Sequence, residues 1–486
     1  MLTKHAPVSI TYRGTSYLLF FLFKINKMTT DITLAGLNHQ SKTIRSWLEK
    51  LLAERFGIIF TLDAIAPNKL HLKWEGTNHG IIFDKLVNDF LLASGDLPCS
   101  EWSPQKEGWQ YIIKPDIPSP GVSNLPSPLI EDNESNFIVH YDILGMIYWM
   151  LTRQEEISPK KLDNFGRFLA PQSHSFKFNY LDRPIVDEWL EVLSQIILRV
   201  SPNLKLKQHK FQIKLSHDVD GPSRYGFLST KQLFIRMAAD FLLRRRIFAP
   251  FIAPWVRLNT RSSLSQLDPV NTFKWIMETS EAHGLTSAFY FICGRTNPTY
   301  DADYDLGHPA IRNLMREIRL RGHEIGLHPS FETFQSPQQL KIEAQTLQNV
   351  CREEGLNLNS FGGRMHFLKW DHPKTLLACN DAGMTYDSTL SYADQPGFRC
   401  GTCHEYPAFD PINYKPLNIR IRPLITMEAS IIAERYMGLG YGEEAYNKFI
   451  SLKSICRKVN GCYTLLWHNN QLNTPHAKRL YESILS

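Results

Sequence analysis

Apolar and polar positions follow two different patterns along the chain, and the change falls near residue 206. Between residues 28 and 206, short β-type runs at 58–61, 70–74 and 109–113 precede helical patterns at 141–153 and 186–200. A stretch rich in proline, serine and asparagine, 115–136, separates these strands from the helices and has the composition of a loop. This order predicts a smaller α+β domain over residues 28–206, with a structural or recognition role.

From residue 207 onward, strand-like runs alternate with helical patterns, as they do in βα units. The runs are 211–215, 287–292, 324–327, 360–363, 384–386 and 462–467. Asp-Pro at 268–269 and Ser-Pro at 336–337 are helix start signals, and glycines at 284, 322 and 383 occupy positions typical of helix C-terminal caps. The pattern predicts an α/β fold over residues 207–486, closed as an irregular or incomplete parallel (β/α) barrel.

Polar residues of chemical interest follow the ends of these predicted strands. Those residues are Asp218 and Asp220 after the first run, His328 after the third, Arg364 and His366 after the fourth, Asp387 after the fifth, and His468 after the last. In parallel barrels the loops at the carboxyl ends of the strands converge on one mouth. The sequence therefore predicts that these side chains share one site.

The same residues fall within motifs that resemble those of the polysaccharide deacetylases (carbohydrate esterase family 4, the NodB homology domain). The matching segments, in chain order, are Ser-His-Asp-Val-Asp-Gly-Pro at 216–222, Arg-Gly-His-Glu-Ile-Gly-Leu-His at 321–328, Gly-Arg at 363–364, Asp-Ser at 387–388 and Leu-Leu-Trp-His at 465–468. The resemblance covers roughly residues 211–470. It implies a metal-dependent hydrolase that removes an acetyl group, most simply an N-acetyl group, from a sugar.

The resemblance also implies a role for each motif residue. Asp218 would be the general base, and Arg364 would pair with it and hold it ionised. Asp220 and His328 would hold a divalent metal, most simply zinc, with a position left open for water. His468 would be the general acid, kept charged by Asp387. His217 and His323 are expected to be structural neighbours of the site.

One position departs from the family pattern. The second motif normally carries another histidine four residues after the first, and here that residue is Glu332. We expect His366 to supply the third metal ligand, because Arg364 and His366 are two residues apart and leave an extended chain on the same face. Glu332 is the alternative, since carboxylates also bind zinc. A protein without the metal would be a degenerate member of the fold that binds a glycan or a biosynthetic partner.

The resemblance extends to a bacterial subgroup in which an upstream domain precedes the deacetylase-like domain and whose proteins are associated with surface-polysaccharide synthesis. Its marks here are Leu-Thr-Arg-Gln-Glu-Glu at 151–156, Leu-Asp-Arg-Pro at 181–184 and Arg-Met-His-Phe-Leu at 364–368. It implies a carbohydrate substrate, either lipid-linked or polymeric.

Charge is concentrated in one segment. The chain has a net charge of +6, whereas residues 223–267 alone hold eight basic residues and one acid. The remainder is close to neutral, which argues against a nucleic-acid-binding surface. Residues 230–246 combine Phe234, Met237, Phe241 and Leu242 with three consecutive arginines. Two interpretations stay open for them, peripheral contact with an anionic membrane and a solvated helix that caps the barrel.

Eight sparse, irregularly spaced cysteines argue against a disulfide framework and favour a reducing compartment. The apolar run 17–23 is too short to span a bilayer, and Lys24 to Lys27 follow it where a cleavage site would need small residues. We therefore expect a cytoplasmic protein, with residues 1–27 as a non-native or disordered extension. Cys-Gly-Thr-Cys-His at 400–404 matches the haem c attachment pattern, but its place in a loop of the barrel domain argues against haem.

Overall fold

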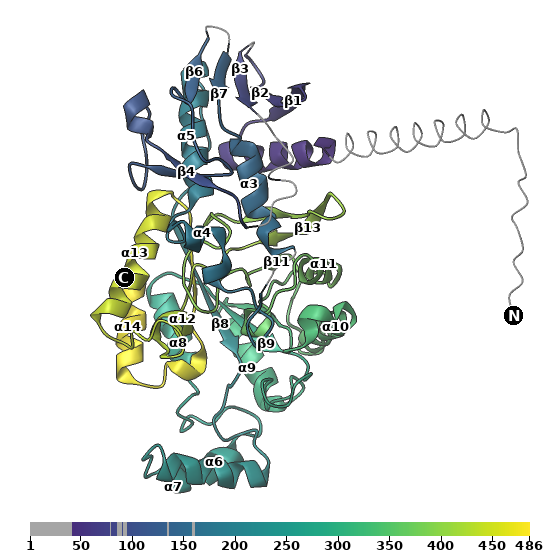
Figure 1. Cartoon of the computed structure of the whole chain (residues 1–486). Coiled ribbons are helices and arrows are strands. Elements are labelled where there is room, and N and C mark those ends of the chain that lie inside the picture. Colours follow the sequence, from purple (N-terminus) through teal and green to yellow (C-terminus); the bar gives the residue numbers. More distant parts are fainter. Residues whose placement is uncertain (1–40, 78, 85–89, 91–94, 134–135, 158–160) are drawn as a thin grey trace, which may run out of the picture.

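The computed structural model describes residues 41–77, 79–84, 90, 95–133, 136–157 and 161–486. The extension 1–27, with its apolar run, lies outside these residues. In Figure 1 the upstream domain stands above the strands of the second domain, and a pair of helices projects below them. Among the described residues, no helix is both long enough and apolar enough to cross a bilayer.

The upstream domain is built on a mixed five-stranded sheet. Its strands are β1 (Phe60–Ala66), β2 (Lys69–Trp74), β3 (Gly80–Asp84), β6 (Ile130–Asp132) and β7 (Asn136–Val139), in the order β1-β2-β3-β7-β6. Residues 41–56 are helical, and the other helices are α3 (Ile143–Leu151), α4 (His174–Lys177) and α5 (Ile185–Val200). β4 (Cys99–Trp102) and β5 (Ile117–Pro120) form a separate antiparallel pair. The helix α5 contacts β3, β5 and β7, so its apolar side covers both sheets.

Two predictions for this domain were wrong. Residues 109–113 are not a strand. The backbone N–H and carbonyl group of Gln110 are both hydrogen-bonded to the side-chain amide of Gln195. The Trp109 ring is buried, and the guanidinium carbon of Arg199 lies 3.5 Å from its centre. The stretch 115–136 is not simply a loop, because it contains β5 and β6. Ile117 and Ile130 in these strands are buried, but the surrounding prolines and serines obscure the strand pattern in the sequence.

The second domain has an α/β architecture with a parallel sheet, as predicted. Its five strands are β8 (Gln212–Val219), β9 (Ser287–Ile292), β10 (Glu324–His328), β14 (Thr426–Met427) and β15 (Cys462–Leu466), in the order β10-β9-β8-β15-β14. Neighbouring strands pair in parallel throughout. Every residue of β9 and β15 is buried, as expected for parallel strands that are covered on both faces.

The row of strands continues beyond β10 through one residue. Gly363 forms parallel bridges with Leu327 and with Asp387, so the predicted run 360–363 is reduced to a single bridge. A Cβ atom at this position would lie 2.0 Å from the carbonyl oxygen of Leu327, which explains why a glycine precedes Arg364. Beyond it lie β11 (Tyr386–Asp387), β13 (Lys415–Ile421) and β12 (Tyr406–Asp410). Full closure of the barrel stays a prediction.

Helices cover the outside of these strands. They are α8 (Phe273–Ala282), α9 (Pro309–Leu320), α10 (Pro337–Glu353), α11 (Lys374–Asp381), α12 (Glu428–Ile432), α13 (Glu443–Lys458) and α14 (Pro475–Leu485). α10 begins at the predicted proline, but α8 begins four residues after Pro269. Asp268 instead accepts a hydrogen bond from the Arg224 backbone (2.8 Å) and one from the Ser223 hydroxyl, and so closes the base of an insertion. That insertion carries α6 (Thr230–Leu242) and α7 (Ala249–Asn259).

A buried network of ion pairs between charged side chains joins the two domains. Arg153 of the upstream domain donates to Glu156 from Nε (2.8 Å), and Arg399 of the second domain donates to the same carboxylate from Nε (3.0 Å) and Nη2 (2.5 Å). The Tyr406 hydroxyl donates to the Leu151 carbonyl oxygen (3.0 Å) beside this network. The motif at 151–156 is thus part of the domain interface, and the two domains share one continuous apolar core.

Candidate functional site

Three predicted residues bring their polar atoms together at the carboxyl ends of the strands. Asp220 follows β8, His328 ends β10, and His366 lies two residues after Arg364. The Asp220 Oδ1 atom is 3.2 Å from His328 Nε2 and 3.8 Å from His366 Nε2. One ligand-type atom from each residue lies within 4.8 Å of the other two. The spacing is that of a group able to surround a metal ion.

The outer nitrogen of each histidine is anchored by the protein. His328 Nδ1 lies 2.6 Å from the carbonyl oxygen of Arg364, and His366 Nδ1 lies 3.1 Å from the carboxylate of Asp301. Both partners can only accept a hydrogen bond here, so each Nδ1 carries the proton. In the neutral ring, Nε2 then has a free lone pair directed at Asp220. Metal-ligating histidines are commonly held in this way.

The inner atoms of the cluster fit a cation. Asp220 Oδ1 and His328 Nε2 are both buried and lack a hydrogen-bond partner, which is costly for polar atoms in a protein interior. Burial raises the pKa of Asp220, but in the absence of a metal the positive charge of the protonated His366, His328 and His468 rings outweighs it and holds that pKa well below its usual value. The carboxylate therefore stays ionised, and these residues fit a divalent metal.

Glu332 lies apart from this cluster. Its carboxylate is half exposed, and its Oε2 is 3.4 Å from the ammonium group of Lys369. The Lys369 ammonium also lies 3.6 Å from the centre of the Phe331 ring, which holds it over that side of the loop. The structure thus brings His366, rather than Glu332, to Asp220 and His328.

Asp218 and Arg364 form a buried ion pair, as expected. Arg364 Nη1 donates to Asp218 Oδ1 at 2.8 Å, and both side chains are almost completely buried. The rest of the guanidinium is held in place by the Ser388 carbonyl oxygen (2.8 Å) and the Ser216 hydroxyl (2.9 Å). Asp218 Oδ2 lies 3.7 Å from His328 Nε2, so the carboxylate borders the candidate metal site.

The partner assigned to His468 was wrong. His468 Nδ1 bonds Glu428 Oε1 at 2.5 Å, while its Nε2 faces Asp220 Oδ2 at 3.5 Å. Burial lowers the pKa of His468, but the carboxylates of Glu428, Asp220 and Asp218 outweigh it and raise that pKa to about 10. The imidazole is thus protonated at neutral pH, and Glu428 is its hydrogen-bond partner.

Asp387 has a different place. Its carboxylate accepts hydrogen bonds from the backbone N–H (2.8 Å) and the hydroxyl (2.6 Å) of Thr389, and burial raises the pKa of the carboxyl to about 6. The Thr389 hydroxyl oxygen in turn accepts from the backbone N–H of Met365 at 2.9 Å. Asp387 therefore supports the segment that carries Arg364 and His366, and does not contact His468.

A small cavity, about 170 Å³, opens onto these groups. Arg167 of the upstream domain forms part of its wall, together with Tyr436 and Phe367. The backbone N–H and the side-chain Nε of Arg167 each donate a hydrogen bond to the Asp163 carboxylate (both 2.8 Å). The Arg167 guanidinium also donates to the Phe367 carbonyl oxygen (3.1 Å) and the Tyr436 hydroxyl (3.2 Å). The upstream domain thus contributes directly to the candidate site, which its sequence did not indicate.

Comparisons with known proteins give partial matches. Residues 39–202 match a family of unknown function, DUF7033. No curated protein matches the chain. Among solved structures, a candidate polysaccharide deacetylase from Mycobacterium smegmatis covers 57% of this chain and 83% of its own at 14% identity, with a TM-score of 0.36. A candidate polysaccharide deacetylase from Pseudomonas aeruginosa PAO1 covers 57% and 84% at 13% identity, with a TM-score of 0.34. Puue allantoinase covers 56% and 82% at 11% identity, with a TM-score of 0.33.

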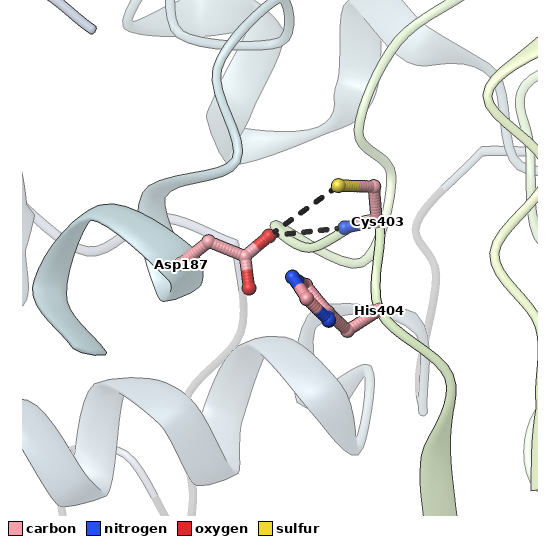
Figure 2. A group of neighbouring side chains, drawn as sticks. All are labelled: Asp187, Cys403 and His404. Atoms are coloured by element: carbon pink, nitrogen blue, oxygen red, sulfur yellow. Dashed lines mark hydrogen bonds between the residues drawn. The ribbon is translucent and has the colours of Figure 1, made fainter. Parts of the chain in front are cut away.

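A second group of metal-type side chains lies at the opposite, amino-terminal ends of the strands. Figure 2 shows Asp187, Cys403 and His404 at the junction of the two domains. Asp187 accepts from the Thr402 hydroxyl (2.9 Å) and the Cys403 backbone (3.1 Å) and lies 3.4 Å from the Arg55 guanidinium. His404 Nε2 donates to the Val459 carbonyl oxygen at 3.2 Å. These polar atoms already have protein partners, so the group is a structural junction.

The same junction contains the Cys-Gly-Thr-Cys-His sequence. Cys400 and Cys403 are both completely buried, and burial raises the pKa of each thiol. Haem attachment would require both sulfur atoms to face a haem-sized space. Their position inside the domain interface agrees with the interpretation that this sequence is structural.

Proposed function

We propose that the protein is a metal-dependent hydrolase that removes an acetyl group, most simply an N-acetyl group, from a sugar. The observation that carries the proposal is the cluster of Asp220, His328 and His366, whose inner atoms converge while the outer nitrogens of both histidines are anchored. Two further acid–base groups flank this cluster, and the motif resemblance favours an acetylated carbohydrate as the substrate. The fold alone would not identify the reaction.

Asp220, His328 and His366 would hold the metal, and one carboxylate with two imidazoles suits zinc. A bound divalent metal would polarise the acetyl carbonyl group and lower the pKa of a water molecule. Asp218 lies at the edge of the cluster and takes the proton from the attacking water as general base. Its hydrogen-bonded ion pair with Arg364 fixes the orientation of the carboxylate beside the cluster.

His468 lies on the other side of Asp220 and would protonate the leaving nitrogen. A general acid must hold its proton before the carbon–nitrogen bond breaks, and the contact with Glu428 ensures this. The amine that leaves can then depart in neutral form. Glu428 acts as a positioning residue, because it orients the ring through Nδ1 and leaves Nε2 to face the cavity.

The proposal is tested first by metal content. Purified wild-type protein should bind about one zinc per chain, and His366→Ala should lose it, because one of three protein ligands is removed. Glu332→Ala is the matched control and should keep the metal. Each variant is checked for folding by circular dichroism. Metal loss in the Glu332 variant with retention in the His366 variant would make His366 a substrate-binding residue instead.

The second test is acetate release from a panel of N-acetylated and O-acetylated oligosaccharides. Wild-type protein should release acetate, and Asp218→Asn should reduce the rate by about 100 to 10,000-fold while keeping its metal, because the base is not a ligand. Metal-loaded wild-type protein that releases no acetate from any member of the panel would refute the hydrolase proposal. It would favour the alternative, a glycan-binding protein with a degenerate site.

A further inference from the structure

The insertion between β8 and α8 carries an unusual share of the exposed apolar surface. Of the 22 large apolar side chains that are exposed in the described part of the chain, 11 lie within residues 223–267. This segment, which we call the hairpin, contains less than a tenth of the sequence. Exposed apolar side chains gathered in one place mark an interaction surface more often than scattered ones do.

The hairpin has an interior of its own. Leu233 of α6 packs with Ala253 and Val256 of α7 in a small core that is separate from the main core of the protein. Asp240 is fully buried at its centre, where it accepts hydrogen bonds from the Tyr225 hydroxyl (2.7 Å) and from Arg244 Nη1 (2.7 Å). The exposed apolar side chains are therefore additional to those that fold the two helices together.

These exposed side chains form stripes on the outer sides of the helices. On α7 and the residue before it, they recur at intervals of three or four residues, which places them on one helix face: Phe248, Phe251, Trp255 and Leu258, each between 56% and 78% exposed. On α6, Phe234 and Phe241 lie two turns apart, each followed by another exposed aliphatic residue. Large aromatic and aliphatic residues on one helix face are typical of helices that lie in a membrane interface.

The charge of the hairpin indicates which surface it meets. It holds eight basic residues, and its single acid, Asp240, is buried and already paired. A second copy of the protein would bring two strongly positive surfaces together, whereas an anionic bilayer offers both an apolar interior and negative headgroups. We propose that the hairpin docks the protein on the surface of an anionic lipid bilayer, with the apolar stripes inserted and the basic residues at the headgroups.

The hairpin and the candidate active site share one end of the second domain. The Asn469 amide donates to the carbonyl oxygens of Gly221 (3.1 Å) and Val270 (3.0 Å), which lie at the two ends of the insertion. Asn469 directly follows His468, so the base of the hairpin is tied to the residue beside the general acid. Figure 1 shows α6 and α7 beyond the ends of β8 and β9. On the proposed function, docking would present the site to acetylated sugars carried on lipids.

Vesicle flotation of the full-length protein tests the docking directly. Wild-type protein should float with vesicles of phosphatidylcholine and phosphatidylglycerol, and much less with phosphatidylcholine alone or in 0.5 M salt. Phe248→Ser/Phe251→Ser/Trp255→Ser should weaken the affinity at least about a hundredfold, because three aromatic side chains no longer insert into the bilayer. Arg245→Gln/Arg246→Gln should weaken it about 25-fold at low salt, since each charge near an anionic surface contributes about fivefold. Ile59→Ser/Leu320→Ser/Ile342→Ser removes exposed apolar side chains elsewhere and should bind as wild type does.

Each outcome decides the proposal. Wild-type protein that does not float with anionic vesicles at low salt, or an aromatic variant that floats equally well, would overturn it. A wild-type dimer in light scattering that becomes a monomer in the aromatic variant, without vesicle binding, would assign the surface to a second copy. Acetate release from soluble oligosaccharides should be the same in all hairpin variants, so a failure of docking is distinguishable from a failure of the proposed activity.

Discussion

Replacing Glu156 by glutamine removes the charge that compensates two buried guanidinium groups. Arg153 and Arg399 both donate to this carboxylate, and all three side chains are at most 3% exposed. Burial raises the pKa of Glu156, but Arg399 and Arg153 outweigh it and lower that pKa from 4.5 to about 2. Glu155 also faces Arg153, so the variant retains part of the compensation. The substitution tests whether this network holds the domains together.

The lowered pKa corresponds to about 3 kcal/mol of stability at neutral pH. Breaking one partner of a buried ion pair typically costs about 3–5 kcal/mol, which agrees with this value. Because the pKa in the folded protein is below its unfolded value, the stabilisation is complete above about pH 5 and is lost as the pH falls toward 2. We expect Glu156→Gln to lower the free energy of unfolding by about 3 kcal/mol at pH 7, and by about half as much near pH 3.

Urea unfolding followed by tryptophan fluorescence at pH 7, 5 and 3 measures this difference. Burial lowers the pKa of His372 to about 4 and the Glu156 carboxylate partly offsets this, so the difference between wild type and variant in acid includes this contact as well as the two arginines. Glu101→Gln, on an exposed position of β4, is the control and should change stability by less than about 0.5 kcal/mol. A loss for Glu156→Gln that is equal at pH 7 and pH 3 would refute the electrostatic explanation, as would a loss below about 1 kcal/mol at pH 7.

Two further predictions concern residues that anchor the site. Asp301→Asn should weaken zinc affinity about 10 to 100-fold in a competition titration, because it alters the hydrogen bond that orients His366, whereas Asp303→Asn on the exposed part of the same loop should not. Equal affinities in the two variants would remove Asp301 from the metal site. Glu428→Gln should lower kcat for acetate release about 100-fold, and more than Asp387→Asn does, because Glu428 contacts His468 directly. A larger loss in the Asp387 variant would reverse this assignment.

Sequence reasoning located most residues of the candidate site because they lie in short motifs at the ends of regular strands. Asp218 lies at the end of the long strand β8, Asp220 follows this strand, and His328 ends β10, so the apolar pattern of the two strands located these residues. His366 could be located by the same argument, since it lies two positions after Arg364 in the chain. The parallel α/β fold was equally visible, because β9 and β15 are mostly apolar and are buried along their whole length.

The residues that sequence reasoning missed lie where the local pattern gives no such signal. Glu428 follows β14, a strand of two residues that is too short to show a period, so its carboxylate could not be placed beside His468. Asp387 took that role in the prediction because its motif resembles the family pattern, although the neighbouring Thr389 already satisfies its carboxylate. Asp301 lies nine residues after β9, in a loop that folds back to bond Phe331 and His366.

The role of Arg167 could not be predicted from the sequence for a different reason, because it depends on how the two domains pack. The sequence near it contains no motif, and its guanidinium meets the second domain at Phe367 and Tyr436, about 200 or more residues later in the chain. Phe367 itself has a positive φ of 60°, an uncommon conformation for a non-glycine residue, which leaves its carbonyl oxygen bonded to Arg167 and the adjacent His366 directed at Asp220. The upstream domain and the segment that carries His366 thus hold each other in place, so a chain cut between the domains should lose the arrangement of the site even if both parts fold.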